Sequence, residues 1–257
     1  MRSKIALIYE GVRAEKRLFD NIEKNFFAND CELVVIRMPA DGNIYMLWER
    51  LQEDDFETDI ISVIKEMCKS VKIDDSNNLR SSEFSEVYLF FDYDLHSKKN
   101  NLKKIHRGKD IVKEMLETFD NETENGKLYI SYPMVESIKD ISLERKVYDN
   151  LCISLPQSGD YKKVVNGQSD FLNYDRITFN MWLCACKASV KRASFLVNDT
   201  EECDYDTFIK KVTQREIYFV QRDKFVIGNE TIAIINALPL FLVEYYKESF
   251  WNQIMEI

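Results

Sequence analysis

Residues 86–96, EVYLFFDYDLH, constrain the fold more than any other part of the chain. The run from Val87 to Phe91 is β-branched, aliphatic or aromatic throughout and carries no charge, which predicts a strand buried on both faces of a sheet. Asp92 and Asp94 follow at its carboxyl end. Because residues two apart in an extended segment project to the same side, both carboxylates can point to one place above the sheet edge.

This pair of aspartates predicts a metal site. Two carboxylates held close together repel each other unless a cation lies between them, and oxygen ligands suit hard ions such as Mg²⁺ or Mn²⁺. Aspartate is also common in turns, so a strand that runs into a solvated turn is the alternative interpretation. His96 could contact the metal or the substrate, but no spaced third ligand accompanies it, and we expect it to cap the loop.

Composition indicates a soluble globular protein. The chain has 257 residues, 45% hydrophobic and 31% charged, enough for one large domain or a domain with an appendage. It has no transmembrane-length apolar stretch and no secretory signal, so we expect a cytoplasmic protein without a membrane partner. Six cysteines without a CxxC pair predict buried free thiols. With a net charge of −9, the chain would bind nucleic acid only through a local basic face.

The N-terminal segment has the pattern of a βαβ unit. Residues 4–9 form an apolar strand that ends at Glu10 and Gly11, and helical spacing begins at Val12. A strand, a glycine turn and a helix in this order open a βαβ unit, so Glu10 ends a first strand as Asp92 ends a later one. Ligands of open α/β sheets bind at this edge.

The remaining elements follow from the same patterns. Further strands are expected over residues 32–36 and 127–131, and helices over 44–51, 56–71, 110–119, 175–192, 204–220 and 229–255, the last kinked or broken at Pro239. The polar residues 72–86 are expected to form a loop. The pattern predicts an N-terminal α/β domain over residues 1–150 and a mostly helical C-terminal region over residues 151–257.

The order of these motifs resembles the TOPRIM domain of topoisomerases, primases and certain nucleases. The resemblance rests on Glu10 and Gly11 in ALIYEG, followed after a helix by Asp92 and Asp94 in LFFDYDLH. It implies a TOPRIM-like Rossmannoid domain with a mainly parallel sheet. Strand passage, another TOPRIM activity, needs a nucleophilic tyrosine in a separate domain, and no segment identifies one.

More narrowly, IYEGVRAEKRLFDNI resembles the opening of the OLD, RloB-like and AriB-like nucleases of bacterial phage defence. The second glutamate of that opening corresponds to Glu15, which precedes the aromatic Phe19. The segment YPMVESIKD is similar to a later segment of these proteins in which another acid follows a strand, and Glu136 is the match. The resemblance covers residues 5–140 and does not extend to the C-terminal helices.

The resemblance implies an enzyme and a partner. The implied activity is Mg²⁺-dependent hydrolysis of phosphodiester bonds in DNA or RNA, with tRNA among the candidates, by the effector of an anti-phage defence system. The implied partner is a separate ABC-type ATPase, and the chain itself contains neither GxxxxGKS/T nor GxGxxG. A homodimer is one form that the active protein could take.

Phosphodiester cleavage needs charge neutralisation at the phosphate, an activated water and a group that handles protons, and two divalent ions can supply the first two. Three acids are assigned to the first ion, namely Glu10, Asp92 and Asp94, with Glu10 also a candidate general base. Glu15 and Glu136 are candidates for the second ion, although Glu15 could instead be a solvated residue that the helix dipole favours. Lys139 is a candidate for facing the scissile phosphate, with an ordinary surface lysine as the alternative.

A basic cluster directly follows the aspartates and is the candidate nucleic-acid contact: Lys98, Lys99, Lys103, Lys104, His106, Arg107 and Lys109. Its position beside the acids suits contact with a phosphate backbone. A solvated loop is the alternative interpretation of such a charge run. For the whole chain, the alternative is a non-catalytic α/β interaction subunit of a defence complex, whose acids bind a structural ion or nothing.

Overall fold

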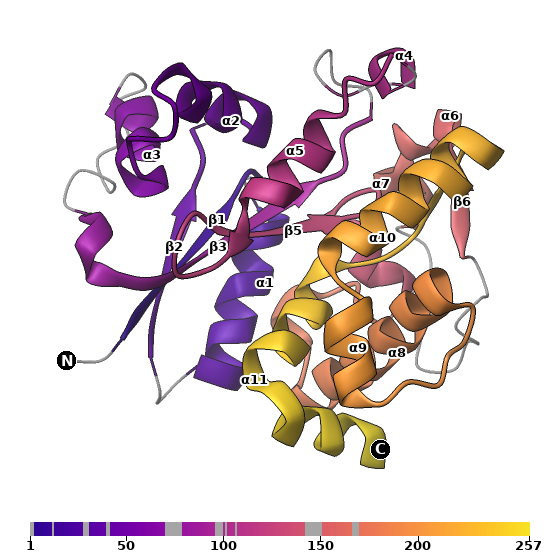
Figure 1. The fold of residues 1–257 in the computed structure, drawn as a ribbon. Helices are drawn as coiled ribbons and strands as arrows, with labels where there is room; N and C mark the ends of the chain where they lie inside the picture. The colour runs from indigo at the N-terminus through magenta and orange to yellow at the C-terminus, as the bar shows by residue number, and fades with distance from the viewer. Residues whose placement is uncertain are drawn as a thin grey trace. The chain divides into compact units, whose positions relative to one another are not determined.

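The computed structural model describes residues 3–11, 13–27, 31–39, 42–69, 79–95, 100, 102–105, 107–141, 151–165 and 170–257 (Figure 1). The chain divides into two compact units. The first unit comprises Met1–Phe91 and Glu114–Leu128, and the second comprises Asp92–Lys113 and Tyr129–Ile257. The predicted domain boundary near residue 150 lies outside the described residues and stays a prediction.

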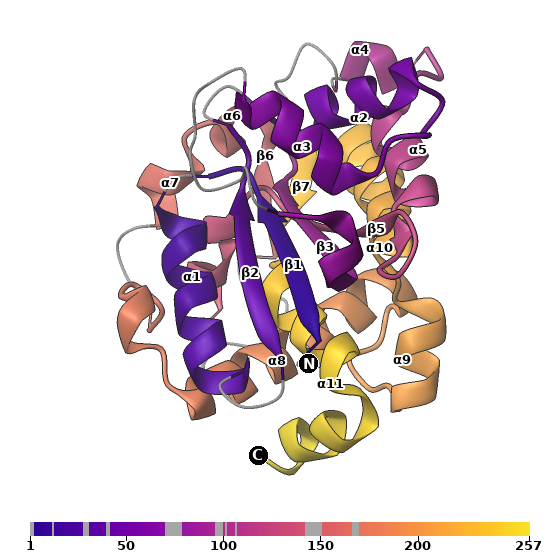
Figure 2. The same cartoon turned by 90° about the vertical axis from the view of Figure 1, so that its left-hand side faces the viewer.

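A five-stranded sheet has the strand order β2-β1-β3-β5-β4. The central strand β1 (Lys4–Tyr9) pairs in parallel with β2 (Glu32–Arg37) and with β3 (Phe84–Asp92), and Figure 2 shows the three side by side. The short β4 (Asp120–Asn121) pairs antiparallel with β5 (Gly126–Ser131). The protein is therefore an α/β protein with a mostly parallel sheet. The carboxyl ends of β1, β2 and β3 lie along one edge.

Strands β1 and β3 lie inside the sheet because each contains an uninterrupted run of apolar residues. Every residue from Ile5 to Tyr9 is buried, as is every residue from Tyr88 to Phe91. A strand with both faces covered needs apolar side chains at odd and even positions alike, which is what these two runs supply. The predicted doubly buried strand ending at Asp92 is confirmed.

The helices beside the sheet are α1 (Ala14–Ile22), which continues as the π-helix η1 (Glu23–Phe27), α2 (Ile44–Glu53), α3 (Ile60–Lys69) and α5 (Ile111–Thr118). The side chain of Asn43 caps α2 by accepting a hydrogen bond from the Met46 amide. The helix predicted from residue 56 begins later, because Asp55 and Phe56 adopt positive φ angles of 54° and 62°. This left-handed backbone ends α2 and cannot belong to a helix.

The second unit is mostly helical. Its elements after β5 are η4 (Val135–Asp140), β6 (Cys152–Ser154), α6 (Leu155–Ser158), α7 (Tyr161–Val164), η6 (Tyr174–Arg176), α8 (Phe179–Asn198), α9 (Tyr205–Lys211), α10 (Gln214–Val220), η7 (Gln221–Ile227), β7 (Thr231–Ala233) and α11 (Ala237–Glu256). The two longest helices, α8 and α11, pack against each other. The short α4 (Leu102–Ile105) also belongs to this unit.

Three sequence predictions in this unit need correction. The helix predicted over residues 204–220 is two helices, because the Thr213 side chain caps α10. The helix predicted from residue 229 is preceded by β7, which pairs antiparallel with β6. Pro239 neither kinks nor breaks α11, since it stands in the first turn, where the missing amide costs no hydrogen bond. The non-helical residue of α11 is Lys247, with a φ of 60°.

No helix in the described part of the chain is long and apolar enough to cross a membrane. All six cysteines are free thiols, as predicted, but the predicted burial holds for three of them. Cys31, Cys68 and Cys186 are buried, whereas Cys152 is exposed.

Candidate functional site

Glu15 lies against the turn between β1 and α1. Glu10 directly follows β1 and is half-buried, and Glu15 is half-buried in the first turn of α1. A Cβ atom at Gly11 would come within 1.8 Å of Glu15 Oε1, so the Glu15 carboxylate occupies the space that any side chain at position 11 would need. Glycine at this position therefore permits Glu15 to lie beside the end of β1. This placement fits both the ligand interpretation of Glu15 and that of a residue that the helix dipole favours, so its role as a ligand stays a prediction.

The sequence analysis missed a cation at the same edge. Arg37 is the last residue of β2 and lies opposite Tyr9 in the register of the sheet. Burial raises the pKa of Tyr9, and the positive charge of Arg37 opposes that shift, so the two side chains are near each other. The Arg37 side chain is half-buried, and its Nε is buried without a hydrogen-bond partner. The signal in the sequence is a single charge that ends the apolar strand ELVVIR at the ligand-binding edge.

Asp92 and Asp94 differ in their surroundings. Asp92 is half-buried, and its Oδ1 accepts a hydrogen bond from the Val135 amide at 2.8 Å. Asp94 is exposed, and its amide donates to the Asp92 carbonyl oxygen at 3.0 Å. That bond between residues two apart marks a tight turn at Tyr93. The extended geometry assumed for the pair therefore ends at Asp92, and shared coordination by Asp92 and Asp94 stays a prediction.

Glu136 is a buried carboxylate with one unsatisfied oxygen. It stands in the 3₁₀ helix η4, and it is only 7% exposed. Its Oε1 lies 3.1 Å from Lys162 Nζ, whereas its Oε2 is buried and has no hydrogen-bond partner. Leaving a buried polar atom without a partner costs about 1–3 kcal/mol, and more when the group is charged. A bound cation would remove that cost.

The backbone around Glu136 is held firmly. Tyr132 and Ile235 exchange both backbone hydrogen bonds, at 2.8 and 3.0 Å. The Asn236 side-chain amide donates to the Val135 carbonyl oxygen at 2.8 Å and to Ser137 Oγ at 2.9 Å. Together with the bond from Val135 to Asp92, these contacts fix the start of η4 beside the end of β3. Asp92 and Glu136 therefore belong to one local arrangement within the second unit.

A hydrogen bond links the C-terminal end of η4 to α7. The Tyr161 hydroxyl donates to the Asp140 carboxylate, and burial raises the pKa of Tyr161 well above its ordinary value. Lys139 is half-buried, with its Nζ 5.4 Å from the centre of the Tyr174 ring. This distance is within the range of a cation–π contact. The predicted contact of Lys139 with a phosphate stays a prediction.

The predicted basic cluster is described only in part. Lys103 and Lys104 stand in α4, and Arg107 and Lys109 follow it, all of them exposed except the half-buried Lys104. Lys98, Lys99, His96 and His106 lie outside the described residues. The described part fits a phosphate contact and a solvated surface equally well.

The acids fit a hard divalent cation by chemistry. In the described ranges, no three His, Cys, Asp or Glu side chains are grouped so that they could hold one metal ion. Glu10 and Glu15 belong to the first unit, and Asp92, Asp94 and Glu136 to the second, so their predicted convergence stays a prediction. All five nevertheless offer only oxygen, the donor that Mg²⁺ and Mn²⁺ prefer, and Glu136 contributes an oxygen that lacks a partner.

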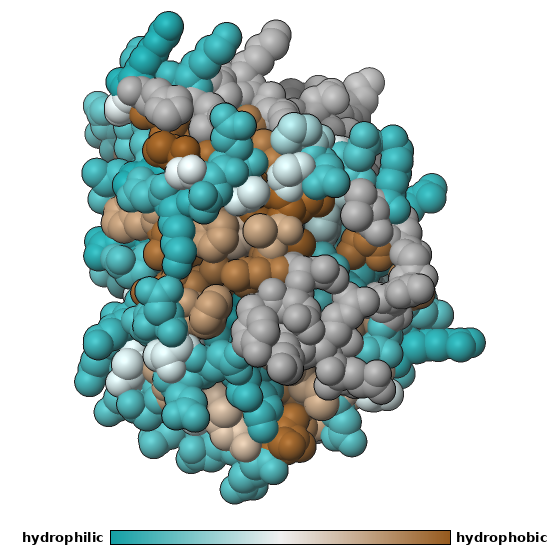
Figure 3. Space-filling model, turned by 90° about the vertical axis from the view of Figure 1, so that its right-hand side faces the viewer, coloured by the Kyte–Doolittle hydropathy of each residue, from teal (hydrophilic) through white to brown (hydrophobic). Residues whose placement is uncertain are grey.

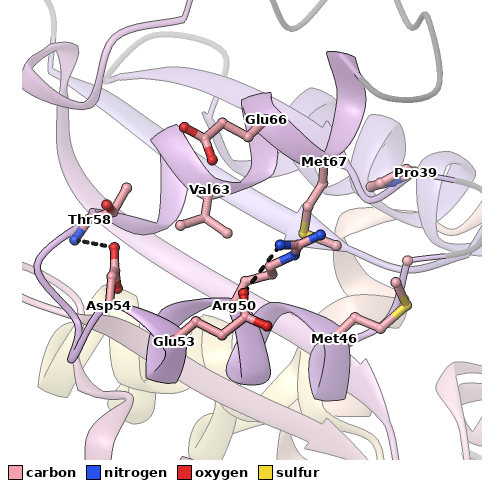
Figure 4. A pocket seen from close by; sticks show the side chains of 10 residues that line it. Pro39, Met46, Arg50, Glu53, Asp54, Thr58, Val63, Glu66 and Met67 are labelled. Atoms are coloured by element: carbon pink, nitrogen blue, oxygen red, sulfur yellow. Dashed lines mark hydrogen bonds and ion pairs between the residues drawn. The ribbon is translucent and has the colours of Figure 1, made fainter.

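A separate cavity of about 360 Å³ lies between α2 and α3 in the first unit (Figure 4). Its charged lining residues are Arg50, Glu53, Asp54 and Glu66. Arg50 forms an ion pair with Glu53 at 3.2 Å, and the Thr58 amide donates to Asp54. With three carboxylates and one guanidinium, this lining disfavours a phosphate. We therefore do not assign the cavity to the candidate site.

Comparison of the chain with family models, with curated proteins and with solved structures finds no match. The functional assignment rests on the residues themselves.

Proposed function

We propose that the chain is a metal-dependent TOPRIM nuclease that hydrolyses phosphodiester bonds in DNA or RNA. One observation carries the proposal. The Asp92 carboxylate, at the end of β3, is hydrogen-bonded to the residue that precedes Glu136, and the buried Glu136 has an oxygen without a partner. Two carboxylates placed in this way supply part of an oxygen-only cation site at the edge where α/β proteins bind ligands.

Each acidic residue has a role in the proposal. Glu10, Asp92 and Asp94 would hold one Mg²⁺ or Mn²⁺ ion, and Glu15 and Glu136 a second. Bound divalent ions would neutralise charge on the phosphate and lower the pKa of water. Glu10 is the candidate general base that accepts the proton of the attacking water, and Lys139 is the candidate that stabilises charge on the phosphate.

The proposal extends to an anti-phage effector that a separate ABC-type ATPase controls, with tRNA among its substrates. The resemblance of IYEGVRAEKRLFDNI to defence nucleases is its basis. The net charge of −9 also suits an effector that should not bind nucleic acid while idle. Because the sequence contains no phosphate-binding glycine loop of the GxxxxGKS/T type, nucleotide hydrolysis would come from the partner.

A non-catalytic interaction subunit is the second candidate. Lys162 already neutralises one oxygen of Glu136, and three ligand-type side chains do not group together within the described residues. Figure 3 shows apolar side chains gathered between hydrophilic ones on the face that it presents, a feature typical of protein contact surfaces. These observations fit a subunit whose acids have a structural role.

Cleavage of labelled substrates separates the two candidates. The purified chain is incubated with single-stranded DNA, duplex DNA and tRNA in Mg²⁺, in Mn²⁺ or in EDTA. A nuclease cleaves at least one substrate only when the metal is present, and Asp92→Asn lowers the rate by about 100-fold or more. The matched control is Asp120→Asn, which changes an exposed aspartate of β4. Equal rates for the two variants, or cleavage that EDTA does not stop, would remove the nuclease proposal.

A further inference from the structure

We infer that Arg37 forms a phosphate-binding site at the carboxyl end of β2. The identity of the ligand as a nucleic-acid phosphate rests on the proposed function, whereas the anion site itself rests on the surroundings of Arg37. The inference adds a residue that neither the motif order nor the acidic residues indicate.

The guanidinium of Arg37 is partly withdrawn from water without a protein partner. The side chain is half-buried, its Nε is buried without a hydrogen-bond partner, and it forms no ion pair within the described residues. Arginine offers five donors in a planar fork and always carries its charge. Desolvating such a group costs free energy unless an anion compensates. An anionic ligand is therefore the missing partner.

Other cations of the first unit contrast with Arg37. Lys16 lies 2.7 Å from Asp20, Lys4 lies 3.3 Å from Glu83, and Arg50 lies 3.2 Å from Glu53. These exposed or half-exposed side chains need a partner less than a desolvated guanidinium does. Arg37 differs from these three in lacking a carboxylate partner among the described residues although its side chain is half-buried.

The charged groups near Arg37 leave its charge available. The groups whose charges act on Tyr9 are Arg37, Lys16, Glu15 and Asp20. Lys16 and Asp20 neutralise each other as an ion pair. Glu15 forms no ion pair with Arg37 in the described part of the chain, so Arg37 is the cation of this group that a ligand can use.

The position of Arg37 and the planar shape of its guanidinium favour phosphate over other anions. Arg37 ends a parallel strand, at the edge where α/β sheets bind their ligands. A guanidinium binds two phosphate oxygens through parallel hydrogen bonds, which explains the preference for arginine at phosphate sites. Glu10 ends the neighbouring strand, so a phosphate on Arg37 would lie at the same edge as a candidate ligand of the metal.

The test measures binding of a labelled twelve-nucleotide RNA, and of the matching DNA, by fluorescence anisotropy in Ca²⁺. The full chain is compared with Arg37→Gln, Arg37→Lys and the control Arg50→Gln, which changes an exposed arginine of the same unit. Loss of one charge-assisted phosphate contact should weaken binding about tenfold or more. It should also reduce the slope of log K against log salt by about 0.7. Arg37→Lys should recover part of the affinity, and Arg50→Gln should bind as the wild type does.

Thermal unfolding separates a ligand site from a structural role. A structural arginine stabilises the protein, so its removal lowers Tm, whereas removal of an unpaired guanidinium leaves Tm unchanged or higher. Inorganic phosphate should raise the Tm of the wild type but not that of Arg37→Gln. A lower Tm of Arg37→Gln without phosphate, together with unchanged oligonucleotide binding, would overturn the inference.

The remaining outcomes are also decisive. No binding of either oligonucleotide by the wild type overturns the inference, as does citrate competing more strongly than pyrophosphate, which would indicate a carboxylate ligand. Binding that depends on Arg37 in a chain that cleaves nothing supports the phosphate site while removing the nuclease proposal. Equal cleavage and equal binding by wild type and Arg37→Gln leave the nuclease proposal in place and remove the role of Arg37.

Discussion

The Asp92 carboxylate accepts a hydrogen bond from the Val135 amide at 2.8 Å. This bond joins Asp92, the last residue of β3, to Val135, the first residue of η4, and Glu136 directly follows Val135. Because Glu136 is buried with one oxygen on Lys162 and the other without a partner, the two acids form a local arrangement suited to a cation.

Substitution Asp92→Asn should remove activity while the fold survives. The asparagine Oδ1 can still accept the hydrogen bond from Val135, so this bond is kept while the negative charge is lost. We expect a fall of about 1 kcal/mol in the free energy of unfolding, as a charge-assisted bond becomes a neutral one. Urea denaturation and cleavage rate measure the two effects. Asp92→Ala, which also loses the bond, should be less stable than Asp92→Asn, and the reverse order would contradict the role of this bond.

Substitution Lys162→Gln should make the thermal stability of the protein depend more strongly on bound metal. Lys162 is 62% exposed and Glu136 9%, so loss of the lysine leaves a buried carboxylate without its counter-ion. We expect a loss of about 1 kcal/mol without metal, a small value because the lysine is largely solvated. Mn²⁺ should then raise Tm more in Lys162→Gln than in the wild type. The control is Lys163→Gln, whose exposed partner is Asp160. An equal effect of Mn²⁺ on both variants would argue against a cation at Glu136.

Substitution Gly11→Ala should displace the Glu15 carboxylate. The new methyl group would lie 1.8 Å from the present position of Glu15 Oε1, and the flexible end of the glutamate is the part that can move. Metal affinity should therefore fall as it does in Glu15→Gln, with little change in Tm. Titration of both variants with Mn²⁺ tests this expectation. Unchanged Mn²⁺ affinity in Gly11→Ala would show that metal binding does not need the Glu15 carboxylate in its present position beside Gly11.

Stability should fall at alkaline pH because of Tyr161. Burial raises its folded-state pKa above the ordinary value of 10.0, so the folded state holds the proton more tightly than the unfolded state. The resulting stability is fully present below pH 10 and is lost as pH rises further. Urea denaturation between about pH 8 and pH 11 measures the slope, which should be shallower in Tyr161→Phe. Identical slopes for Tyr161→Phe and the wild type would contradict the assignment.

Local patterning predicted the centre of the fold well. The β1 strand over residues 4–9 was predicted to the residue, because five apolar residues in a row, Ile5 to Tyr9, stop at a charge and a glycine. The burial of the strand ending at Asp92 followed from the same rule. These elements depend on their own composition, so sequence alone was sufficient.

Features that depend on contacts between residues far apart in the sequence were not predicted. Strands β6 and β7 have three residues each, too short for periodicity, and exist because they pair with each other. The environment of Glu136 depends on Lys162, which α7 supplies from elsewhere in the chain. Arg37 was missed because one charge after an apolar run is also what an ordinary strand end carries.

Titration of Mn²⁺ by calorimetry tests the central claim most directly, namely that Asp92 and Glu136 are both ligands of bound divalent cations. The account predicts at least one ion bound by the wild type and by the control Asp120→Asn. It predicts a loss of about tenfold or more in affinity for both Asp92→Asn and Glu136→Gln. Absence of binding in the wild type, or equal affinity in all four proteins, would contradict it.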